Sequence, residues 1–400
     1  MGCKSIALKR NSKKKRFFLF VHLPINDLVT VLAAYFCTMN WSDEIQNWYR
    51  QHKRDLPWRN TTDAYTIWLS EVILQQTRVE QGLPYFYRFL EKYPDVTAFA
   101  HATEDEILKL WQGLGYYSRG RNMLTTARQV LENNQGVFPT AYQELIKLKG
   151  IGEYTAAAIS SFAANEVQAV VDGNVYRVLA RWFGVEEPVN SPAGKKLFQQ
   201  LANEVLDRQH PGQHNQAMME FGAMLCKPKN PDCSSCPVRE SCQAYQTNCI
   251  HLLPVKLKTL KIKERYFNYF LIGDGHRILL NKRSMNDIWA NMHDLPLIET
   301  TNFTPAEEVP ALPGFKNSFG DHAVIISTSA IQKHVLTHQR IFARFIHLHV
   351  DQPEINLQPS WFYTAVASLE NLAMPKLIYQ FLDQFYHQPH RQTEMLFTRQ

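Results

Sequence analysis

The sequence lacks an excess of basic charge outside its first residues. The seven Lys and Arg residues of segment 1–16, which contains no acidic residue, account for the net charge of +6; the remaining chain has 36 basic and 37 acidic residues, a net charge of −1. Global charge therefore does not predict nucleic-acid binding. Any face that binds DNA has to be a local patch.

The sequence also lacks an uninterrupted apolar run long enough to cross a membrane. The best candidate, segment 17–37, follows the basic run 13–16, as in a signal peptide or membrane anchor, but Pro24 and Asp27 interrupt it. A charged residue in the middle of a membrane span is costly. We therefore interpret residues 1–38 as an extension outside the folded core and expect no membrane association.

Length and composition predict a folded chain of two domains. Hydrophobic residues make up 45% of the sequence and charged residues 20%, which is typical of globular proteins. A chain of 400 residues is too long for one ordinary core. Residues 42–225 show apolar stripes with helical spacing. The stripes include Ile67, Trp68, Val72 and Ile73, and further on Ile107, Leu108, Trp111 and Leu114.

The character of the sequence changes near residue 250. Segment 250–261 is rich in Lys and contains a Pro, as in a linker. The apolar segments 266–272 and 277–280 are separated by Gly-Asp-Gly, which predicts a β-hairpin, and segment 341–348 predicts another strand. We expect residues 262–388 to form a smaller α+β domain.

Four of the seven cysteines lie within 17 residues, in the pattern Cys226-x6-Cys233-x2-Cys236-x5-Cys242. Clustering in a chain of this length predicts metal ligation rather than a disulfide framework, and hence a reducing compartment. Four thiolates hold either Zn²⁺ or a [4Fe–4S] cluster, and the spacing alone modestly favours zinc.

Three further motifs are ambiguous when each is taken alone. Lys149-Gly150-Ile151-Gly152 precedes a helical segment, so it is either an ordinary turn or a hairpin whose N–H groups bind a DNA phosphate. Asp172 sits at a turn that contains a glycine and is either a helix N-cap or a catalytic carboxylate. Glu71 lies among apolar residues, either exposed on an amphipathic helix or with a raised pKa suited to a general acid.

Taken together and in order, these motifs resemble the MutY-type adenine DNA glycosylases across roughly residues 42–390. Arg54-Asp55-Leu56-Pro57-Trp58-Arg59 and Gly113-Leu114-Gly115-Tyr116-Tyr117 match two more motifs of that family. The resemblance implies a multidomain fold, with an all-α helix-hairpin-helix glycosylase domain that carries a [4Fe–4S] cluster loop, followed by an α+β Nudix-like domain. The implied segments are an extension (1–38), the glycosylase domain (39–249) with its cluster loop (226–242), a linker (250–261), the Nudix-like domain (262–388) and a tail (389–400).

The resemblance also implies site residues for base excision repair. Glu71 would protonate adenine, and Asp172 would stabilise the oxocarbenium-like sugar, with support from Tyr154 and Asn174. The other implied groups are the cluster ligands Cys226, Cys233, Cys236 and Cys242; the adenine-pocket residues Arg59, Leu74 and Glu220; the DNA-binding residues Gln76, Tyr116, Lys149, Gly150 and Gly152; and the 8-oxoguanine contacts Leu336, Thr337 and His338. Gln76 and Tyr116 would wedge into the duplex as adenine flips out.

Position 154 bears on the reaction class. Related endonuclease III-like glycosylases carry a Lys there, whose amine attacks the sugar before strand cleavage, whereas Tyr154 cannot form a Schiff base. We therefore expect a monofunctional glycosylase. The alternatives are a pyrimidine glycosylase with lyase activity and a non-catalytic iron–sulfur protein that binds DNA or senses redox state; the paired carboxylates argue against the second.

The resemblance implies partners and substrate as well. Residues 262–388 contain no Glu-rich Nudix box, so metal-dependent pyrophosphate hydrolysis is not expected, and Leu336 stands where the family has an aromatic residue. The expected substrate is double-stranded DNA with adenine opposite 8-oxoguanine or guanine. We expect a monomer in the cytoplasm, associated with the nucleoid.

Overall fold

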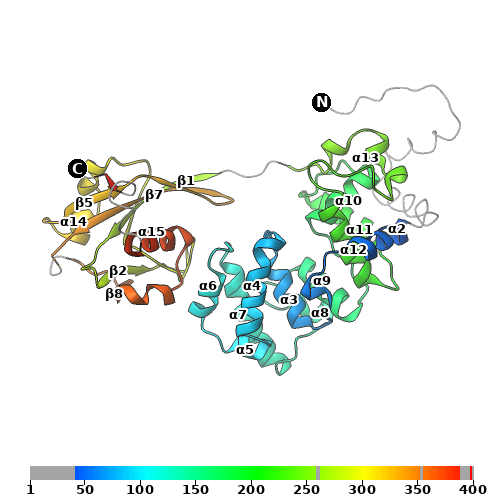
Figure 1. Cartoon of the computed structure of the whole chain (residues 1–400), viewed down its shortest axis with the longest axis horizontal. Coiled ribbons are helices and arrows are strands. Elements are labelled where there is room, and N and C mark those ends of the chain that lie inside the picture. Colours follow the sequence, from blue (N-terminus) through cyan, green and yellow to red (C-terminus); the bar gives the residue numbers. More distant parts are fainter. Residues whose placement is uncertain (1–40, 258–261, 352–354, 388–396, 399–400) are drawn as a thin grey trace. The chain divides into compact units, whose positions relative to one another are not determined.

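The computed structural model describes residues 41–257, 262–351, 355–387 and 397–398 (Figure 1). The predicted extension 1–38 lies outside the described residues, as do the end of the predicted linker and nearly all of the predicted tail. No helix in the described ranges is long and apolar enough to cross a membrane.

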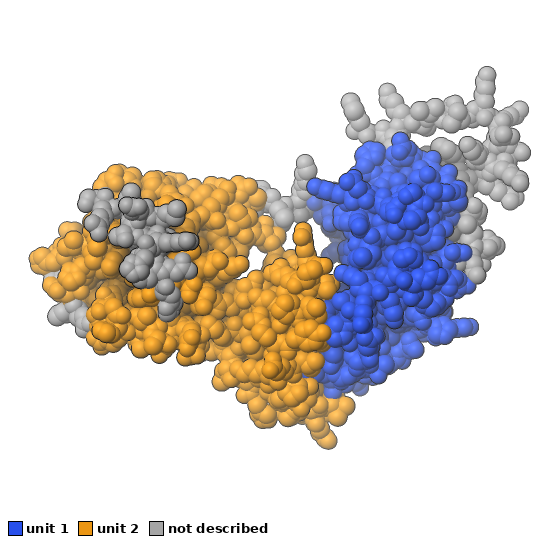
Figure 2. All heavy atoms as spheres, viewed as in Figure 1, with its two compact units in different colours: residues 1–71, 138–258 blue, residues 72–137, 259–400 orange. Residues whose placement is uncertain are grey.

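The chain divides into two compact units (Figure 2). Unit 1 comprises residues 1–71 and 138–258, and unit 2 comprises residues 72–137 and 259–400. The helical region predicted from the sequence therefore contributes to both units.

Unit 1 is helical in its described residues. Its elements are α2 (Trp41–His52), η2 (Pro57–Arg59), α3 (Ala64–Ile73, which runs on into unit 2), α8 (Tyr142–Leu145), α9 (Glu153–Ala164), α10 (Gly173–Phe183), α11 (Pro192–Val205), α12 (Pro211–Met224), η3 (Arg239–Ser241), α13 (Gln243–Gln246) and η4 (Ile250–Leu252). The predicted helical stripes are buried, with Ile67 and Trp68 each 1% exposed.

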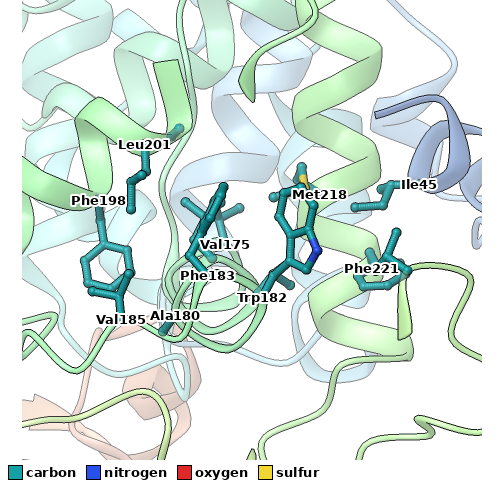
Figure 3. Packing of buried hydrophobic residues seen from close by; sticks show 14 of the residues in the cluster. Ile45, Val175, Ala180, Trp182, Phe183, Val185, Phe198, Leu201, Met218 and Phe221 are labelled. Carbon is teal, nitrogen blue, oxygen red and sulfur yellow. The ribbon is translucent and has the colours of Figure 1, made fainter. Parts of the chain in front are cut away.

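The core of unit 1 forms where α2, α10, α11 and α12 meet (Figure 3). The rings of Trp41 and Trp182 lie 4.1 Å apart between centroids, and Phe198, Leu201 and Phe221 are almost fully buried. Burial of large side chains of this kind stabilises a fold by about 1.5–3 kcal/mol each. This core fixes α10, and with it the turn at the N-terminus of α10.

Glycines allow α12 to lie against its neighbours. A Cβ at Gly212 would come within 2.4 Å of the carbonyl oxygen of Ser161 on α9, and one at Gly222 would lie 2.7 Å from the Cβ of Asn174 on α10. Neither backbone can give way cheaply, because both neighbours are held in regular helices. The glycines of α12 thus set its distance from α9 and from the start of α10.

The helices of unit 2 are α4 (Val79–Lys92), α5 (Val96–Ala100), α6 (Glu104–Trp111) and α7 (Ser118–Asn134). Helix α6 begins with a capping box, in which the side chain of Thr103 accepts from the backbone N–H of Glu106 and Glu106 accepts from that of Thr103. The predicted stripe on this helix is buried, since Ile107, Leu108 and Trp111 are 0% exposed.

Two sheets complete unit 2. The larger sheet has the order β4-β1-β7-β5-β9, with β6 also paired to β7, and the smaller has the order β3-β2-β8. The strands are β1 (Lys263–Leu271), β2 (Arg277–Lys282), β3 (His293–Asp294), β4 (Leu297–Thr300), β5 (Val324–Ser329), β6 (Gln332–Val335), β7 (Gln339–His349), β8 (Trp361–Ala365) and β9 (Phe397–Thr398), with η5 (Ala306–Ala311), α14 (Phe315–Phe319), η7 (Val366–Asn371) and α15 (Lys376–His387) around them.

Both faces of the larger sheet are covered. Tyr269 and Phe345, which are paired across β1 and β7, lie on the face where Phe345 stacks on Phe381 of α15 at 3.8 Å. On the other face, Phe270 packs against Phe319 of α14. The predicted α+β character and the predicted strand over residues 341–348 are confirmed.

The predicted hairpin of residues 266–272 and 277–280 is wrong. The chain does reverse at Gly273–Gly275, where Asp274 accepts hydrogen bonds from two backbone N–H groups, but only one isolated bridge, Gly273↔Ile278, joins the two arms. Beyond it the strands separate into different sheets, because β1 pairs over nine residues with the parallel strand β7 and is buried on both faces. Long-range packing outweighs the local turn signal here.

The close approach at Gly222 generates a stability prediction. Gly222→Ala should lower the free energy of unfolding by about 1–3 kcal/mol, because the new methyl group overlaps Asn174. Gly173→Ala is the matched control on α10, since nothing lies within 4 Å of the position that its methyl group would take, and it should change stability by no more than about 0.5 kcal/mol. Urea and thermal melts measure both; equal stability of the two variants would contradict the packing described.

Candidate active site

Glu71 lies on α3 as a buried carboxyl group, 7% exposed. The hydroxyl of Tyr154, from the first turn of α9, donates to its Oε2 at 2.5 Å. Burial raises the pKa of Glu71 to about 7, and the negative charge of Asp172 also raises it, while the Tyr154 hydrogen bond and the charge of Arg59 lower it. Glu71 therefore keeps its proton to a much higher pH than an ordinary glutamate does.

Asp172 is the N-cap of α10. Its Oδ1 accepts from the backbone N–H groups of Asn174 and Val175, each at 2.8 Å, and its Oδ2 accepts from the Asn174 amide at 2.7 Å. Burial raises the pKa of Asp172 above its ordinary value, and the hydrogen bonds from Val175 and Asn174 oppose this rise without cancelling it. The helix-cap interpretation is thus confirmed, and the hydrogen bonds of the cap hold the Asp172 carboxylate near a second, buried carboxyl. The catalytic role of Asp172 stays a prediction.

Arg177, which the sequence analysis missed, ties this turn to the first cysteine of the cluster loop. Its Nη2 donates to Oδ1 of Asn174 at 2.8 Å and to the carbonyl of Gly222 at 2.6 Å, and its Nε donates to the carbonyl of Cys226 at 2.8 Å. The available signal was a charged residue three positions after Asn174, and therefore on the same helix face. Arg177 thereby holds the amide that itself holds Asp172.

Glu220 forms a buried ion triad with two arginines. Arg54 donates to it through its backbone N, Nε and Nη2, and Arg59 through Nη1 and Nη2, all at 2.7–2.9 Å. These hydrogen bonds and the charge of Arg59 lower the pKa of Glu220 to about 2 against the opposing effect of burial. Arg59 and Glu220, both predicted to line the adenine pocket, are brought together, and Arg54 was not singled out from the sequence.

The four clustered cysteines line one cavity. It contains about 450 Å³ of empty space, part of it open to solvent, and Arg181 reaches its edge, with Nη1 3.5 Å from Sγ of Cys226. Among the described residues no three His, Cys, Asp or Glu side chains are arranged to hold a single metal ion. Four thiols around one cavity are the donor set that a [4Fe–4S] cluster requires, so the residues present fit that group. These cysteines are Cys226, Cys233, Cys236 and Cys242.

The predicted DNA hairpin joins α8 to α9. Gly150 has φ of +81°, a left-handed conformation that glycine adopts at little cost, and Gly152 is the N-cap of α9. In the described structure no side chain caps this helix, and a Cβ at Gly152 would have nothing within 4 Å of it. The start of α9 therefore combines a glycine turn with a helix N-terminus that no side chain caps, the kind of backbone at which an anion can bind.

The remaining predicted residues belong to unit 2. Gln76 and Tyr116 are exposed and have φ of +56° and +48°, and Leu74 is half-buried against Gly82. The turn between β6 and β7 exposes Thr337 and His338, with Leu336 half-buried. The hydroxyls of Tyr116 and Thr337 are hydrogen-bonded, so a predicted wedge residue and a predicted lesion contact lie side by side.

Comparisons with known proteins show what the chain is similar to. Residues 69–205 match the family model of HhH-GPD superfamily base excision DNA repair proteins, and residues 268–384 match that of the NUDIX domain. The chain is 35% identical over 261 residues to an adenine DNA glycosylase of Buchnera aphidicola subsp. Baizongia pistaciae, covering 65% of this chain and 74% of that protein. It is 45% identical over 210 residues to an adenine DNA glycosylase of Mus musculus, covering 50% of this chain and 41% of that one.

A solved structure of a thermostable thymine-DNA glycosylase is also similar, at 28% identity and a TM-score of 0.48, covering 52% of this chain and 95% of that one. The two family models confirm the predicted fold class, a helical helix-hairpin-helix domain followed by an α+β Nudix-like domain. The relative from Buchnera is matched over nearly three quarters of its length at 35% identity. The chain therefore belongs to the adenine DNA glycosylase family.

Proposed function

We propose that this enzyme hydrolyses the N-glycosidic bond of adenine opposite 8-oxoguanine or guanine in double-stranded DNA, without cleaving the strand. The observation that carries the proposal is the buried Glu71 carboxyl, hydrogen-bonded to Tyr154 and close to the capped Asp172. Hydrolysis of this bond needs one protonated and one ionised carboxyl group. Burial raises the pKa of both groups, and three hydrogen bonds from Asn174 and Val175 favour the ionised form of Asp172.

Glu71 acts as the general acid toward the base. Because Tyr154 donates its hydroxyl proton to Oε2, the carboxyl proton of Glu71 resides on Oε1, from which it passes to adenine N7. Protonation makes adenine a better leaving group. A pKa of about 7 keeps this proton available at neutral pH while still allowing its transfer.

Asp172 stabilises the positive charge that develops on the sugar. Its three hydrogen bonds from Asn174 and Val175 favour the ionised form and fix the direction of the carboxylate. In this arrangement Asn174 positions Asp172, and Arg177 positions Asn174. A charge held in place before the reaction needs little reorganisation as the transition state forms.

The adenine pocket includes Arg59, Glu220 and Leu74. Five N–H donors already occupy the oxygens of Glu220, so its role is to hold the guanidinium of Arg59 in one orientation. The hairpin at Lys149, Gly150 and Gly152 binds a DNA phosphate. Leu74 is assigned to the adenine pocket from the family resemblance.

Lesion recognition belongs to the turn of Leu336, Thr337 and His338. The exposed hydroxyl of Thr337 can accept from the N7–H that distinguishes 8-oxoguanine from guanine, and an imidazole can donate or accept. The hydrogen bond to Tyr116 supports this assignment, because it holds the turn beside a proposed wedge residue.

A [4Fe–4S] cluster held by Cys226, Cys233, Cys236 and Cys242 completes the proposal. When bound, the cluster supplies a rigid cross-link of the loop 226–242. The chain's own residues connect this loop to the reaction site, through Arg177 on the carbonyl of Cys226 and Arg181 on that of Lys227. We propose that the enzyme works as a monomer, in the cytoplasm at the nucleoid, where its substrate lies.

Removing either carboxyl should abolish catalysis while sparing DNA binding. Glu71→Gln and Asp172→Asn should each slow adenine release by about 10²–10⁴-fold in single-turnover assays. The first variant removes the proton donor and the second removes the negative charge, and neither changes the shape of the side chain. Glu106→Gln, an exposed carboxylate of unit 2, is the control and should retain full activity. Near-normal rates in either active-site variant would exclude the assigned roles.

The reaction rate should depend on the protonation of Glu71. Because burial raises the folded-state pKa to about 7, the protonated acid persists up to that pH, and the rate should fall about tenfold per pH unit above it. Tyr154→Phe removes a hydrogen bond that lowers the pKa of Glu71, so its alkaline limb should move to higher pH. A limb that stays in place or moves to lower pH in this variant would contradict the assignment.

The substrate and product should identify a monofunctional adenine glycosylase. Three duplexes, with adenine opposite 8-oxoguanine, with thymine glycol or without a lesion, should give base release only from the first. The product strand should stay intact until alkali is added, and borohydride should trap little covalent complex, because Tyr154 has no amine. Release of thymine glycol with efficient trapping would move the protein to the bifunctional class.

A further inference from the structure

Two turns of unit 2 each expose one side chain from a left-handed residue. The first turn follows α3 and contains Gln76, with φ of +56°; the second joins α6 to α7 and contains Tyr116, with φ of +48°. Residues other than glycine rarely adopt this conformation, and they keep it only when surrounding groups hold the backbone. The two turns therefore require a group that fixes them.

One side chain, Arg119 in the first turn of α7, reaches both turns. Its Nη1 lies 2.7–3.2 Å from three carbonyl oxygens, two in the last turn of α3 and one in the first turn, and its Nη2 lies 3.3–3.4 Å from two carbonyl oxygens of the second turn. The acceptors are Val72, Ile73 and Gln75 for Nη1, and Leu114 and Gly115 for Nη2. Each acceptor is a main-chain carbonyl within four residues of Gln76 or Tyr116.

The surroundings hold the guanidinium itself in place. It lies 5.0 Å from the centroid of the Trp111 ring, and the indole N–H of Trp111 donates to the carbonyl of Gly115 at 2.9 Å. The ring of Tyr116 lies on it at 5.9 Å. Burial lowers the pKa of Arg119 to about 10, so the group remains a cation at neutral pH. A cation is also favoured where the carbonyls at the C-terminus of α3 converge.

Arginine suits this position better than lysine does. Its planar fork presents donors in fixed directions to two separate groups of acceptors, whereas a lysine ammonium is a compact point charge with three donors. A lysine here can satisfy one turn and leave the other unsupported.

We propose that Arg119 is a positioning residue that clamps the two turns together, so that Gln76 and Tyr116 enter the DNA duplex as one rigid wedge when adenine is extruded. The inference rests on the proposed wedge role of Gln76 and Tyr116 and goes beyond it by assigning the residue that enforces their geometry. Without the clamp, each turn relaxes separately, and the wedge has to be ordered anew on the DNA.

The chain offers a matched control on the same helix. Arg128 of α7 also donates to backbone carbonyls, through Nε to Ala100 at 3.2 Å and through Nη2 to Ala102 at 2.9 Å, but these lie at the end of α5 and just after it and belong to neither turn. Arg128→Gln therefore shows what it costs to remove an α7 arginine that binds backbone carbonyls elsewhere, with both wedge turns left intact.

The test is a double-mutant cycle that follows base unstacking in the full-length protein. A duplex carries 2-aminopurine beside the adenine that is opposite 8-oxoguanine, and stopped-flow fluorescence gives the unstacking rate. Arg119→Gln should slow unstacking by about 10–100-fold, since misplacement by about 1 Å can cost that much, and Arg119→Lys should recover part of the loss. Arg128→Gln should unstack at the normal rate, and the melting temperatures of all variants are measured in parallel.

The cycle separates the clamp from the wedge. The double variant Gln76→Ala with Tyr116→Ala should itself unstack adenine slowly. Adding Arg119→Gln to it should lower the unstacking rate little further, because Arg119 acts through those two residues. If the effects of the Arg119 and wedge substitutions on the unstacking rate were fully additive, or if Arg119→Gln unstacked adenine no more slowly than Arg128→Gln, the proposed role of Arg119 would be overturned and the wedge role would stand. A wedge variant that unstacks adenine at the normal rate would overturn the wedge role in the proposed function, and the clamp with it.

Discussion

The site depends on one constraint, a carboxyl group buried at Glu71 to which no cation among the described residues is paired directly. Burial favours the neutral form, the hydrogen bond from Tyr154 favours the ionised form, and the pKa of about 7 reflects that opposition. Such a balance requires α3, α9 and the start of α10 to meet with little tolerance. The core of Trp41, Trp182 and Phe221 supplies the necessary rigidity.

Helix α10 connects this chemistry to the rest of unit 1. Its N-terminus holds Asp172 through backbone N–H groups, and one turn later Arg177 reaches the carbonyls of Gly222 and Cys226. The absence of a side chain at Gly222 is what allows α12 to approach Asn174 closely enough for these contacts. One set of hydrogen bonds therefore connects the helix cap at Asp172, the close contact between α12 and α10, and the cysteine loop that begins at Cys226. In unit 2, the hydrogen bonds of Arg119 join two turns in a comparable way.

Local patterns in the sequence predicted the helical region, the α+β region and the strand at residues 341–348, because periodicity and turn chemistry determine those features. The hairpin at Gly273–Gly275 was predicted wrongly, because the pairing of β1 with β7 joins residues more than 70 positions apart, which no local signal contains. Arg54, Arg119 and Arg177 were missed for the same reason: their acceptors are mostly distant carbonyls and carboxylates. The roles of the catalytic and lesion-contacting residues stay predictions.

The central claim is that burial raises the pKa of Glu71 to about 7, and the carboxyl itself can be titrated. ¹³C NMR of protein labelled at the glutamate side-chain carboxyl, assigned by comparison with Glu71→Gln, measures this directly. The account predicts that the Glu71 signal titrates near pH 7. In Asp172→Asn it should titrate at lower pH, because this substitution removes a negative charge that raises the pKa of Glu71. A Glu71 signal that titrates near the usual glutamate value of about 4.3 in the unmodified protein would contradict the account.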